Sequence, residues 1–145
     1  MKISEPPIII EQTFPCPLET VWRAITDPLQ MRQWYFEQLP DFQPVVGFKT
    51  RFDVKAPERT FPHLWEITEV LPLEKIAYNW HYDGYAGDSE VTFELQAQGD
   101  TTRLRVTHTV LQDFPDHIPE FERESGVQGW TFLISERLAA FLEKW

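Results

Sequence analysis

His108 is the side chain in this sequence that is best placed to do chemistry. It is in phase with Val106 and Val110 in a stretch of alternating apolar residues, so it is expected to point to the apolar face of a strand. Because histidine titrates near neutral pH, it could orient a polar atom of a ligand or act as a general base. The alternative is a buried neutral histidine whose ring bonds to a neighbouring hydroxyl, for which Tyr78 and Tyr82 are the candidates. The pattern leaves both interpretations open.

The residues that commonly bind metals do not form a metal site in the sequence. His63, His81, His108 and His117 lack metal-ligand spacing, and by strand phase His81 and His108 should face opposite ways. The single cysteine, Cys16, excludes an internal disulfide and a cysteine-cluster metal site. Its place beside two prolines at a helix start favours packing or capping over a nucleophilic role. We expect neither a metal nor a cofactor.

The acidic residues are not arranged as a catalytic pair. Glu66 and Glu69 lie on an expected strand and differ by an odd step, which should place them on opposite faces. The acidic stretch from Asp113 to Glu124 is most simply a solvated loop, and the alternative is a flexible gate over a cavity mouth. Whether the protein is an enzyme is left open by the sequence, which leans towards a protein without catalytic activity.

Aromatic residues are abundant, at 14% of the chain, with 6 Trp and 11 Phe. Some of them must fill the core, but ligand pockets are also lined mainly by apolar and aromatic side chains with a few polar groups. We expect a cavity, and we expect its ligand-binding residues to be Trp34, Phe52, Trp65, Tyr78, Trp80, Phe93, His108, Gly129, Trp130 and Leu133.

The C-terminal stretch from Gly126 to Trp145 is expected to be a long amphipathic helix against which the rest of the chain packs. Steps of three and four residues place one apolar stripe on a single face, comprising Val127, Trp130, Ile134, Leu138, Phe141 and Trp145, with Leu133 and Leu142 beside it. Gly126 and Gly129 near its start each cost about 1 kcal/mol relative to alanine. Either the first turn is frayed or kinked, or the glycines leave space between the helix and a sheet.

The expected elements before this final helix are short strands and two short helices. A strand from Ile8 to Phe14 precedes a helix that has Pro17 at its first position and runs to about Thr26. Asp27 and Pro28 then start a second short helix with an N-cap and a proline at the first position. Alternating apolar residues predict further strands, each with one apolar face, near residues 48–54, 64–70, 75–82, 90–95 and 104–110, with a turn over 56–62.

Length and charge exclude several classes of protein. We expect residues 1–145 to form a single domain. Thirteen basic and 23 acidic residues give a formal charge of −10, which disfavours binding to nucleic acids or anionic membranes. No apolar run approaches the length of a membrane span, and the proline-containing N-terminus does not resemble a signal peptide. A cytoplasmic location, and a monomer or homodimer, are the default expectations.

Three blocks of the sequence resemble one known family. The segment FPCPLETVWRAITDPLQMRQWYF resembles the opening of the Activator-of-Hsp90-ATPase-like proteins, which belong to the START-like (SRPBCC) superfamily of polyketide cyclases and Bet v 1-type proteins. WEITEVLPLEKIAYNW resembles the central strand pair of the family, and GWTFLISERLAAFLEKW is similar to its final helix. The resemblance implies an α+β helix-grip fold, in which a curved antiparallel sheet of six or seven strands wraps around the C-terminal helix and two short helices follow the first strand.

The resemblance implies three alternative functions. Members of the superfamily bind lipids, hormones or polyketides in a cavity between sheet and helix, and we expect a small hydrophobic or aromatic ligand here. The second alternative is an Hsp90-type co-chaperone or another protein-interaction module. The eukaryotic activators carry a further N-terminal domain, whereas this sequence begins directly at the strand before Pro17, so this alternative is less favoured. The third is a polyketide cyclase or dehydratase, in which His108 would act with a second polar group.

Overall fold

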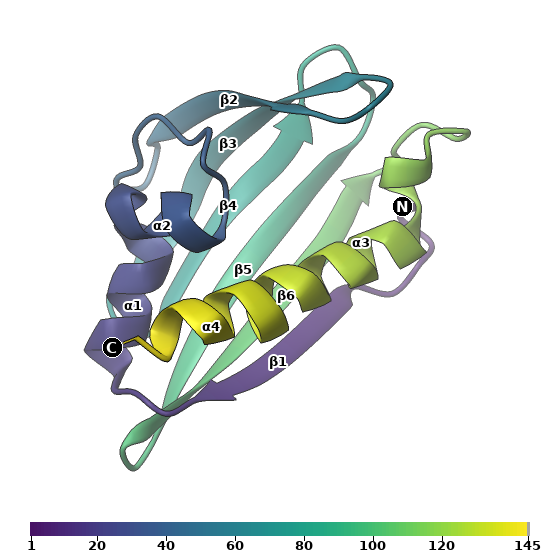
Figure 1. The fold of residues 1–145 in the computed structure, drawn as a ribbon. Coiled ribbons are helices and arrows are strands. Elements are labelled where there is room, and N and C mark those ends of the chain that lie inside the picture. The colour runs from purple at the N-terminus through teal and green to yellow at the C-terminus, as the bar shows by residue number, and fades with distance from the viewer. Residues whose placement is uncertain (145) are drawn as a thin grey trace.

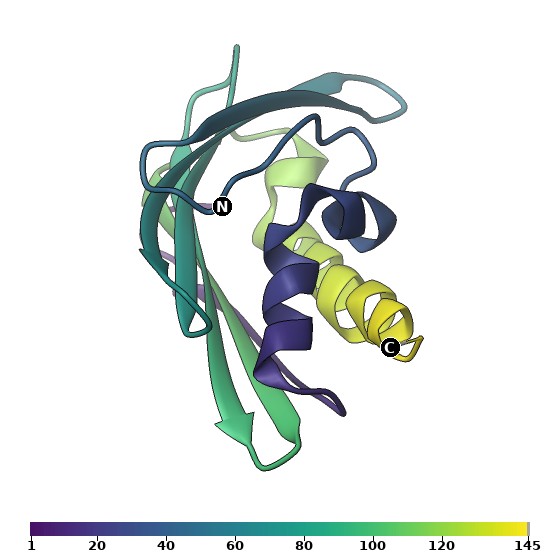
Figure 2. The same cartoon turned by 90° about the vertical axis from the view of Figure 1, so that its left-hand side faces the viewer.

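The protein is described here by a computed structural model that places residues 1–144. A single antiparallel sheet carries all of the helices on one side (Figures 1 and 2). The elements in chain order are β1 (Ile8–Phe14), α1 (Leu18–Thr26), α2 (Pro28–Trp34), β2 (Lys49–Lys55), β3 (Thr60–Leu71), β4 (Lys75–Tyr82), β5 (Asp88–Gln98), β6 (Thr101–Gln112), the 3₁₀ turn η1 (Pro119–Phe121), α3 (Arg123–Thr131), the π-helical segment η2 (Phe132–Leu138) and α4 (Ala139–Leu142). The expected α+β helix-grip fold is confirmed.

The sheet has six strands in the order β1-β6-β5-β4-β3-β2, and each pair of neighbours is antiparallel. It curves around the helices on its inner face (Figure 2). Burial alternates along most of the strands, as in β6, where Thr102, Leu104, Val106 and His108 point inward. This one-sided burial follows from the period-two pattern of the sequence, because successive side chains of a strand point to opposite faces.

Strand β3 is longer than the sequence indicated. It starts at Thr60, so the turn expected over residues 56–62 is confined to residues 56–59. Pro62 lies within the strand, and its carbonyl accepts a hydrogen bond from the Asp83 backbone N–H at 3.0 Å. The backbone N–H that proline lacks would point to the same side as this carbonyl, towards the residues just past the end of β4. Few of the hydrogen bonds between β3 and β4 are therefore lost. His63 therefore becomes a strand residue, and its side chain is buried.

A β-bulge in β3 overturns the expected placement of Glu66 and Glu69. The register with β4 shifts between Ile67 and Glu69, so Glu66 lies opposite Asn79 and Glu69 lies opposite Ala77. Asn79 and Ala77 are two residues apart, which places both glutamates on the same face, contrary to the prediction. They are not a catalytic pair, because each forms an ion pair with a different lysine: Glu66 with Lys49 and Glu69 with Lys75.

The two short helices cover one end of the inner face, close to the C-terminus (Figure 1). Pro17 is the N-cap of α1 rather than its first helical residue, and its carbonyl accepts from the backbone of Thr20 and Val21. Asp27 caps α2 as predicted, accepting a hydrogen bond from the Leu29 backbone N–H at 2.9 Å. The indole of Trp34 at the end of α2 is fully buried.

The final helix runs without a break from Arg123 through α3, η2 and α4, three residues earlier than predicted. Its buried stripe comprises Trp130, Ile134, Leu138, Phe141 and Leu142, while Val127 and Leu133 are partly buried, and Trp145 lies outside the described residues. Burial of each large side chain contributes roughly 1.5–3 kcal/mol, as an upper estimate. The helix is thus held on the sheet mainly by its apolar face.

The segment before the helix is not a purely solvated loop. Phe114 and Phe121 are buried within it, and their rings lie 5.3 Å apart. Phe121 belongs to η1 and also packs against Phe61 of β3, with ring centroids 5.3 Å apart. These aromatic anchors bring the acidic segment against the end of the sheet that is far from α1.

The two helix glycines have different surroundings. A Cβ atom added to Gly126 would lie 2.9 Å from the Ile8 side chain and 3.2 Å from the Met1 sulfur, so the helix approaches β1 closely at this point. A Cβ added to Gly129 would meet no atom within 4 Å. Gly126 therefore permits close packing, whereas Gly129 borders open space.

Substitutions at the two glycines should change stability in opposite directions. Gly126→Leu should lower the free energy of unfolding by about 1–3 kcal/mol, because the larger side chain forces helix and strand apart. Gly129→Ala should raise it by about 0.5–1 kcal/mol, because alanine restricts the unfolded chain and meets nothing in the fold. Urea denaturation of both variants measures the difference, and a stabilised Gly126→Leu protein would contradict the packing described.

Candidate functional site

A hollow of about 270 Å³ lies between the C-terminal helix and the sheet. The helix contributes Gly126, Gly129, Trp130, Phe132 and Leu133, and the sheet contributes His63, Trp80, Tyr82 and His108. Phe36, which follows α2, and Met1 and Glu120 complete the lining. The wall is therefore predominantly aromatic.

The hollow opens to solvent along the helix. Gly129 is exposed, and Phe132 next to it keeps 49% of its surface accessible. At the far side, Glu120 of η1 forms an ion pair with Arg59 of the β2–β3 turn, with Oε1 and Nη1 2.6 Å apart. This ion pair joins two segments 61 residues apart in sequence beside the hollow. Of the acidic stretch from Asp113 to Glu124, Glu120 is the residue that lines the hollow.

Five of the ten predicted ligand-binding residues line this hollow, namely Trp80, His108, Gly129, Trp130 and Leu133. The other five, Trp34, Phe52, Trp65, Tyr78 and Phe93, are at most 5% exposed and pack among other aromatic rings. The alternation along a strand predicts which side chains point to the inner face. It does not predict which part of that face is covered by the helices α1 and α2. The structure therefore places these five in the core beside the hollow rather than on its wall.

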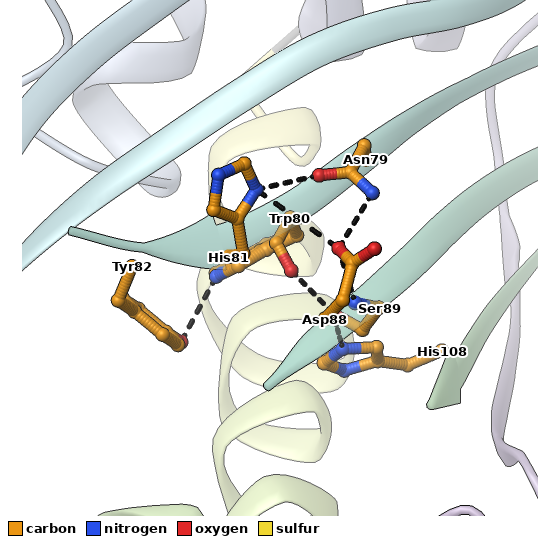
Figure 3. Close-up of polar contacts among 7 residues, drawn as sticks. All are labelled: Asn79, Trp80, His81, Tyr82, Asp88, Ser89 and His108. Atoms are coloured by element: carbon orange, nitrogen blue, oxygen red, sulfur yellow. Dashed lines mark hydrogen bonds and ion pairs between the residues drawn. The ribbon is translucent and has the colours of Figure 1, made fainter. Parts of the chain in front are cut away.

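His108 sits in a chain of hydrogen bonds that links the helix to the sheet. Figure 3 shows the part of this chain that lies within the sheet. The indole N–H of Trp130 donates to His108 Nδ1 at 3.0 Å, which leaves the ring proton on Nε2. His108 Nε2 then donates to Ser89 Oγ at 2.8 Å, and the Ser89 hydroxyl donates to the Trp80 carbonyl at 2.6 Å. Both ring nitrogens are therefore occupied by the protein itself.

The environment keeps His108 neutral. Burial lowers its pKa to about 4, and the positive amino terminus nearby acts in the same direction. The hydroxyl partner is Ser89 and not either predicted tyrosine, because Tyr78 bonds to the Tyr35 hydroxyl at 2.8 Å and Tyr82 accepts from Trp80. Of the two interpretations of His108, the structure supports the buried, hydrogen-bonded one. A general base or a ligand-orienting donor would have to give up one of these hydrogen bonds.

His63 is a polar residue of the hollow that was not among the predicted ligand-binding residues. Its Nδ1 lies 2.9 Å from the carbonyl of Phe61, which can only accept, so Nδ1 carries the proton and Nε2 is an acceptor. Nε2 has no hydrogen-bond partner among the described residues. Burial lowers the pKa of the ring to about 4. His63 is in phase with Phe61 and Trp65, a signal that the expected turn over Ala56–Pro62 obscured.

The remaining candidate residues lie away from the hollow. Cys16 is buried, and burial raises the pKa of its thiol, which favours packing over nucleophilic chemistry. His81 lies on the outer face of β4, where its Nδ1 is 2.6 Å from Asn79 Oδ1, so it does point away from His108 as predicted (Figure 3). Within residues 1–144, no group of three or more His, Cys, Asp and Glu side chains is arranged to hold a metal ion.

Comparison with known proteins identifies a family and a set of similar folds. The family model described as Activator of Hsp90 ATPase homolog 1-like protein matches residues 15–143. No curated protein matches the chain in sequence. Among residues 1–144, the helices lack the length and apolar character needed to cross a membrane.

Several solved structures share the fold. MLL2253 from Mesorhizobium loti is 28% identical with a TM-score of 0.71, over 95% of this chain and 97% of that one. CalU16 from Micromonospora echinospora is 24% identical with a TM-score of 0.67, over 94% of this chain and 75% of that one. DynU16, a protein of the dynemicin biosynthetic locus, is 24% identical with a TM-score of 0.75, over 96% of this chain. The chain spans about half of DynU16, at 48% of its length.

Acidification should destabilise the protein through the two buried histidines. Their pKa values are about 4 in the fold and near 6.5 when exposed, so unfolding between these values takes up a proton at each ring. The contribution of each neutral histidine to the free energy of unfolding is fully present above pH 6.5. It falls by up to about 1.4 kcal/mol per pH unit as the pH drops towards 4. Urea denaturation across this range should show a shallower pH dependence for His63→Phe and His108→Gln than for the native protein.

His81→Gln is the matched control, because His81 is half-exposed on the outer face. Its pH dependence should follow that of the native protein. If His63→Phe and His108→Gln kept the full native slope, the two rings would not be buried in the neutral form.

Proposed function

This chain belongs to the family of Activator of Hsp90 ATPase homolog 1-like proteins, and on that premise we propose that it binds a small aromatic molecule. The binding site is the hollow between the C-terminal helix and β3, β4 and β6. The fold is a ligand-binding fold of the START-like superfamily, but the fold alone does not name a ligand. The proposal therefore depends on the chemistry of this hollow.

The observation that carries the proposal is the open space beside Gly129. Glycine within a helix is unfavourable, yet Gly129 lines the hollow and a Cβ added there would meet no atom within 4 Å. The wall beside it is formed by the rings of Trp80 and Trp130, whose centroids lie 5.6 Å apart. Flat apolar ligands gain both hydrophobic burial and favourable ring contacts against such a wall.

Charge and size narrow the class of ligand. Glu120 is the one acidic side chain at the hollow among the described residues, and it is already paired with Arg59. Both histidines of the wall are neutral, since burial lowers the pKa of each to about 4. A volume of about 270 Å³ is at the lower limit for drug-sized ligands. A small, uncharged molecule fits these conditions best.

A thermal-shift screen of the purified protein tests this function. The compounds should include fused two-ring aromatics, flavonoids, aromatic polyketides and fatty acids. A compound at a hundred times its dissociation constant adds about 2.7 kcal/mol to the stability of the fold, which gives a visible increase in Tm. Gly129→Leu, which fills the hollow, should abolish the shift, whereas Gly129→Ala should retain most of it. No shift with any class, or shifts unchanged in Gly129→Leu, would contradict binding in the hollow.

Binding alone is proposed, without catalysis. A cyclase or dehydratase reaction would need His108 to exchange protons with the substrate, but Trp130 and Ser89 occupy its two nitrogens. A low pKa also makes the ring a weak base at neutral pH. Neither condition favours His108 as a general base.

Interaction with an Hsp90-type chaperone is the second candidate, and the family description favours it. If the protein acts in this way, it should be retained on an immobilised chaperone middle domain at micromolar concentration. Gly129→Leu provides the control, because filling the hollow should leave a surface interaction unchanged. Absence of retention for both proteins would rule out this candidate at that concentration.

A further inference from the structure

Apart from Glu120, which is paired with Arg59, the polar side chains of the hollow fall into one completed and one incomplete chain of hydrogen bonds. In the completed chain, Trp130 donates to His108, His108 to Ser89, and Ser89 to the Trp80 carbonyl, so every donor has an acceptor. The incomplete chain involves His63 and Tyr82. His63 is buried and Tyr82 is half-buried, and both line the hollow, so the unpaired groups at the two ends of this chain are open to a ligand.

The ends of the incomplete chain have opposite hydrogen-bonding character. The Trp80 indole N–H donates to the Tyr82 hydroxyl oxygen at 2.9 Å, and the proton of that hydroxyl has no acceptor among residues 1–144 (Figure 3). At the other end, His63 donates through Nδ1 to the Phe61 carbonyl and presents the lone pair of Nε2. Tyr82 therefore offers a donor, and His63 offers an acceptor.

The two ends are neighbours in the sheet. His63 of β3 and Tyr82 of β4 are directly opposite in the register, and their rings lie 4.8 Å apart at 85°. Both residues line the hollow. A single polar group of a ligand placed between them would have to accept from one and donate to the other.

We propose that the ligand is a neutral aromatic hydroxyl compound, whose O–H donates to His63 Nε2 and whose oxygen accepts from Tyr82. This inference rests on the proposed function and adds the chemical class of its ligand. The ligand hydroxyl completes a chain that runs from the Trp80 indole through Tyr82, the ligand and His63 to the Phe61 carbonyl. Hydrogen bonds in such a chain polarise and strengthen one another.

Other polar groups fit the two ends less well. A carboxylate has no proton to donate to His63, and its burial would need a positive partner. The nearby positive groups are already bonded, Arg59 to Glu120 and the amino terminus to the Phe121 carbonyl. An ammonium group cannot accept from Tyr82. An ether or ketone accepts from Tyr82 but leaves His63 without a donor.

The volume sets the size of the aromatic part. A dry apolar cavity of about 150 Å³ holds one benzene ring. The hollow of about 270 Å³ is therefore large enough for two fused rings that carry the hydroxyl group.

Three related probes separate the hydroxyl contribution from burial of the rings. 2-Naphthol donates and accepts, 2-methoxynaphthalene only accepts, and naphthalene does neither. Isothermal titration at neutral pH should give the tightest binding for 2-naphthol, about tenfold tighter than for 2-methoxynaphthalene, which is the effect expected for one well-placed hydrogen bond.

Two variants test the acceptor of His63 and the donor of Tyr82 separately. His63→Phe keeps a ring but removes the acceptor, so 2-naphthol and 2-methoxynaphthalene should bind with equal affinity. Tyr82→Phe removes the donor, so 2-methoxynaphthalene should lose its advantage over naphthalene. His81→Phe and Tyr85→Phe are the matched controls, since His81 lies on the outer face of β4 and Tyr85 bonds to the Thr60 carbonyl away from the hollow wall. Both controls should bind all three probes as the native protein does.

The outcomes distinguish this inference from the proposed function. If the three probes bind the native protein equally and Gly129→Leu abolishes their binding, the hollow binds aromatics and the role of His63 and Tyr82 is wrong. If His63→Phe and Tyr82→Phe both retain the native preference for 2-naphthol, the inference is likewise overturned. If none of the probes binds, the inference fails together with binding of small aromatics in the hollow.

Discussion

The contact between the C-terminal helix and the inner face of the sheet is the interaction on which the rest of this structure depends. Burial of the apolar stripe from Trp130 to Leu142 provides most of the energy, but hydrophobic burial is not directional. The hydrogen bond from Trp130 to His108 supplies direction, because sliding the helix would leave a buried indole N–H and a buried imidazole nitrogen without partners. The helix is thereby held at one position along β6.

The hollow exists because the C-terminal helix does not pack closely on the sheet beside the contact between Trp130 and His108. Gly126 allows the helix to lie against Ile8, whereas the space at Gly129, one turn later, is left open. The helix then changes to π geometry at Phe132, which lines the hollow. Segments of π-helix are rare and often occur at functional sites, because the wider turn alters how side chains project. Close packing and open space thus alternate along one helix within a few residues.

The two buried histidines show how similar residues acquire different roles. Both are neutral and both lie on the inner face of the sheet. His108 makes two hydrogen bonds to side chains, which gives it a structural role. His63 lines the hollow, uses one nitrogen for its own strand and leaves the other without a partner among the described residues. The number of hydrogen bonds that each ring already makes, rather than its burial or pKa, decides which of them is available to a ligand.

Most of the fold could be predicted from the sequence. Periodicity identified the elements, because the repeats of two and of three to four residues follow directly from strand and helix geometry. The N-cap at Asp27, the inward direction of His108 and the apolar stripe of the final helix are local consequences of residue type and spacing. The resemblance of three blocks to one family indicated how these elements are joined, and the family match over residues 15–143 agrees with it.

The details of the candidate site depended on tertiary structure. The bulge after Ile67 reverses the face of Glu69, and a shift of one residue in strand pairing cannot be read from alternation alone. Pro62 resembled a turn residue, but the end of β4 lies opposite it, so β3 continues and His63 is buried. Ser89 became the partner of His108 because β5 and β6 pair in that register. Residue type and spacing determined which side chains face inward, whereas the pairing of distant strands decided which of them meet, since those contacts join residues far apart in the chain.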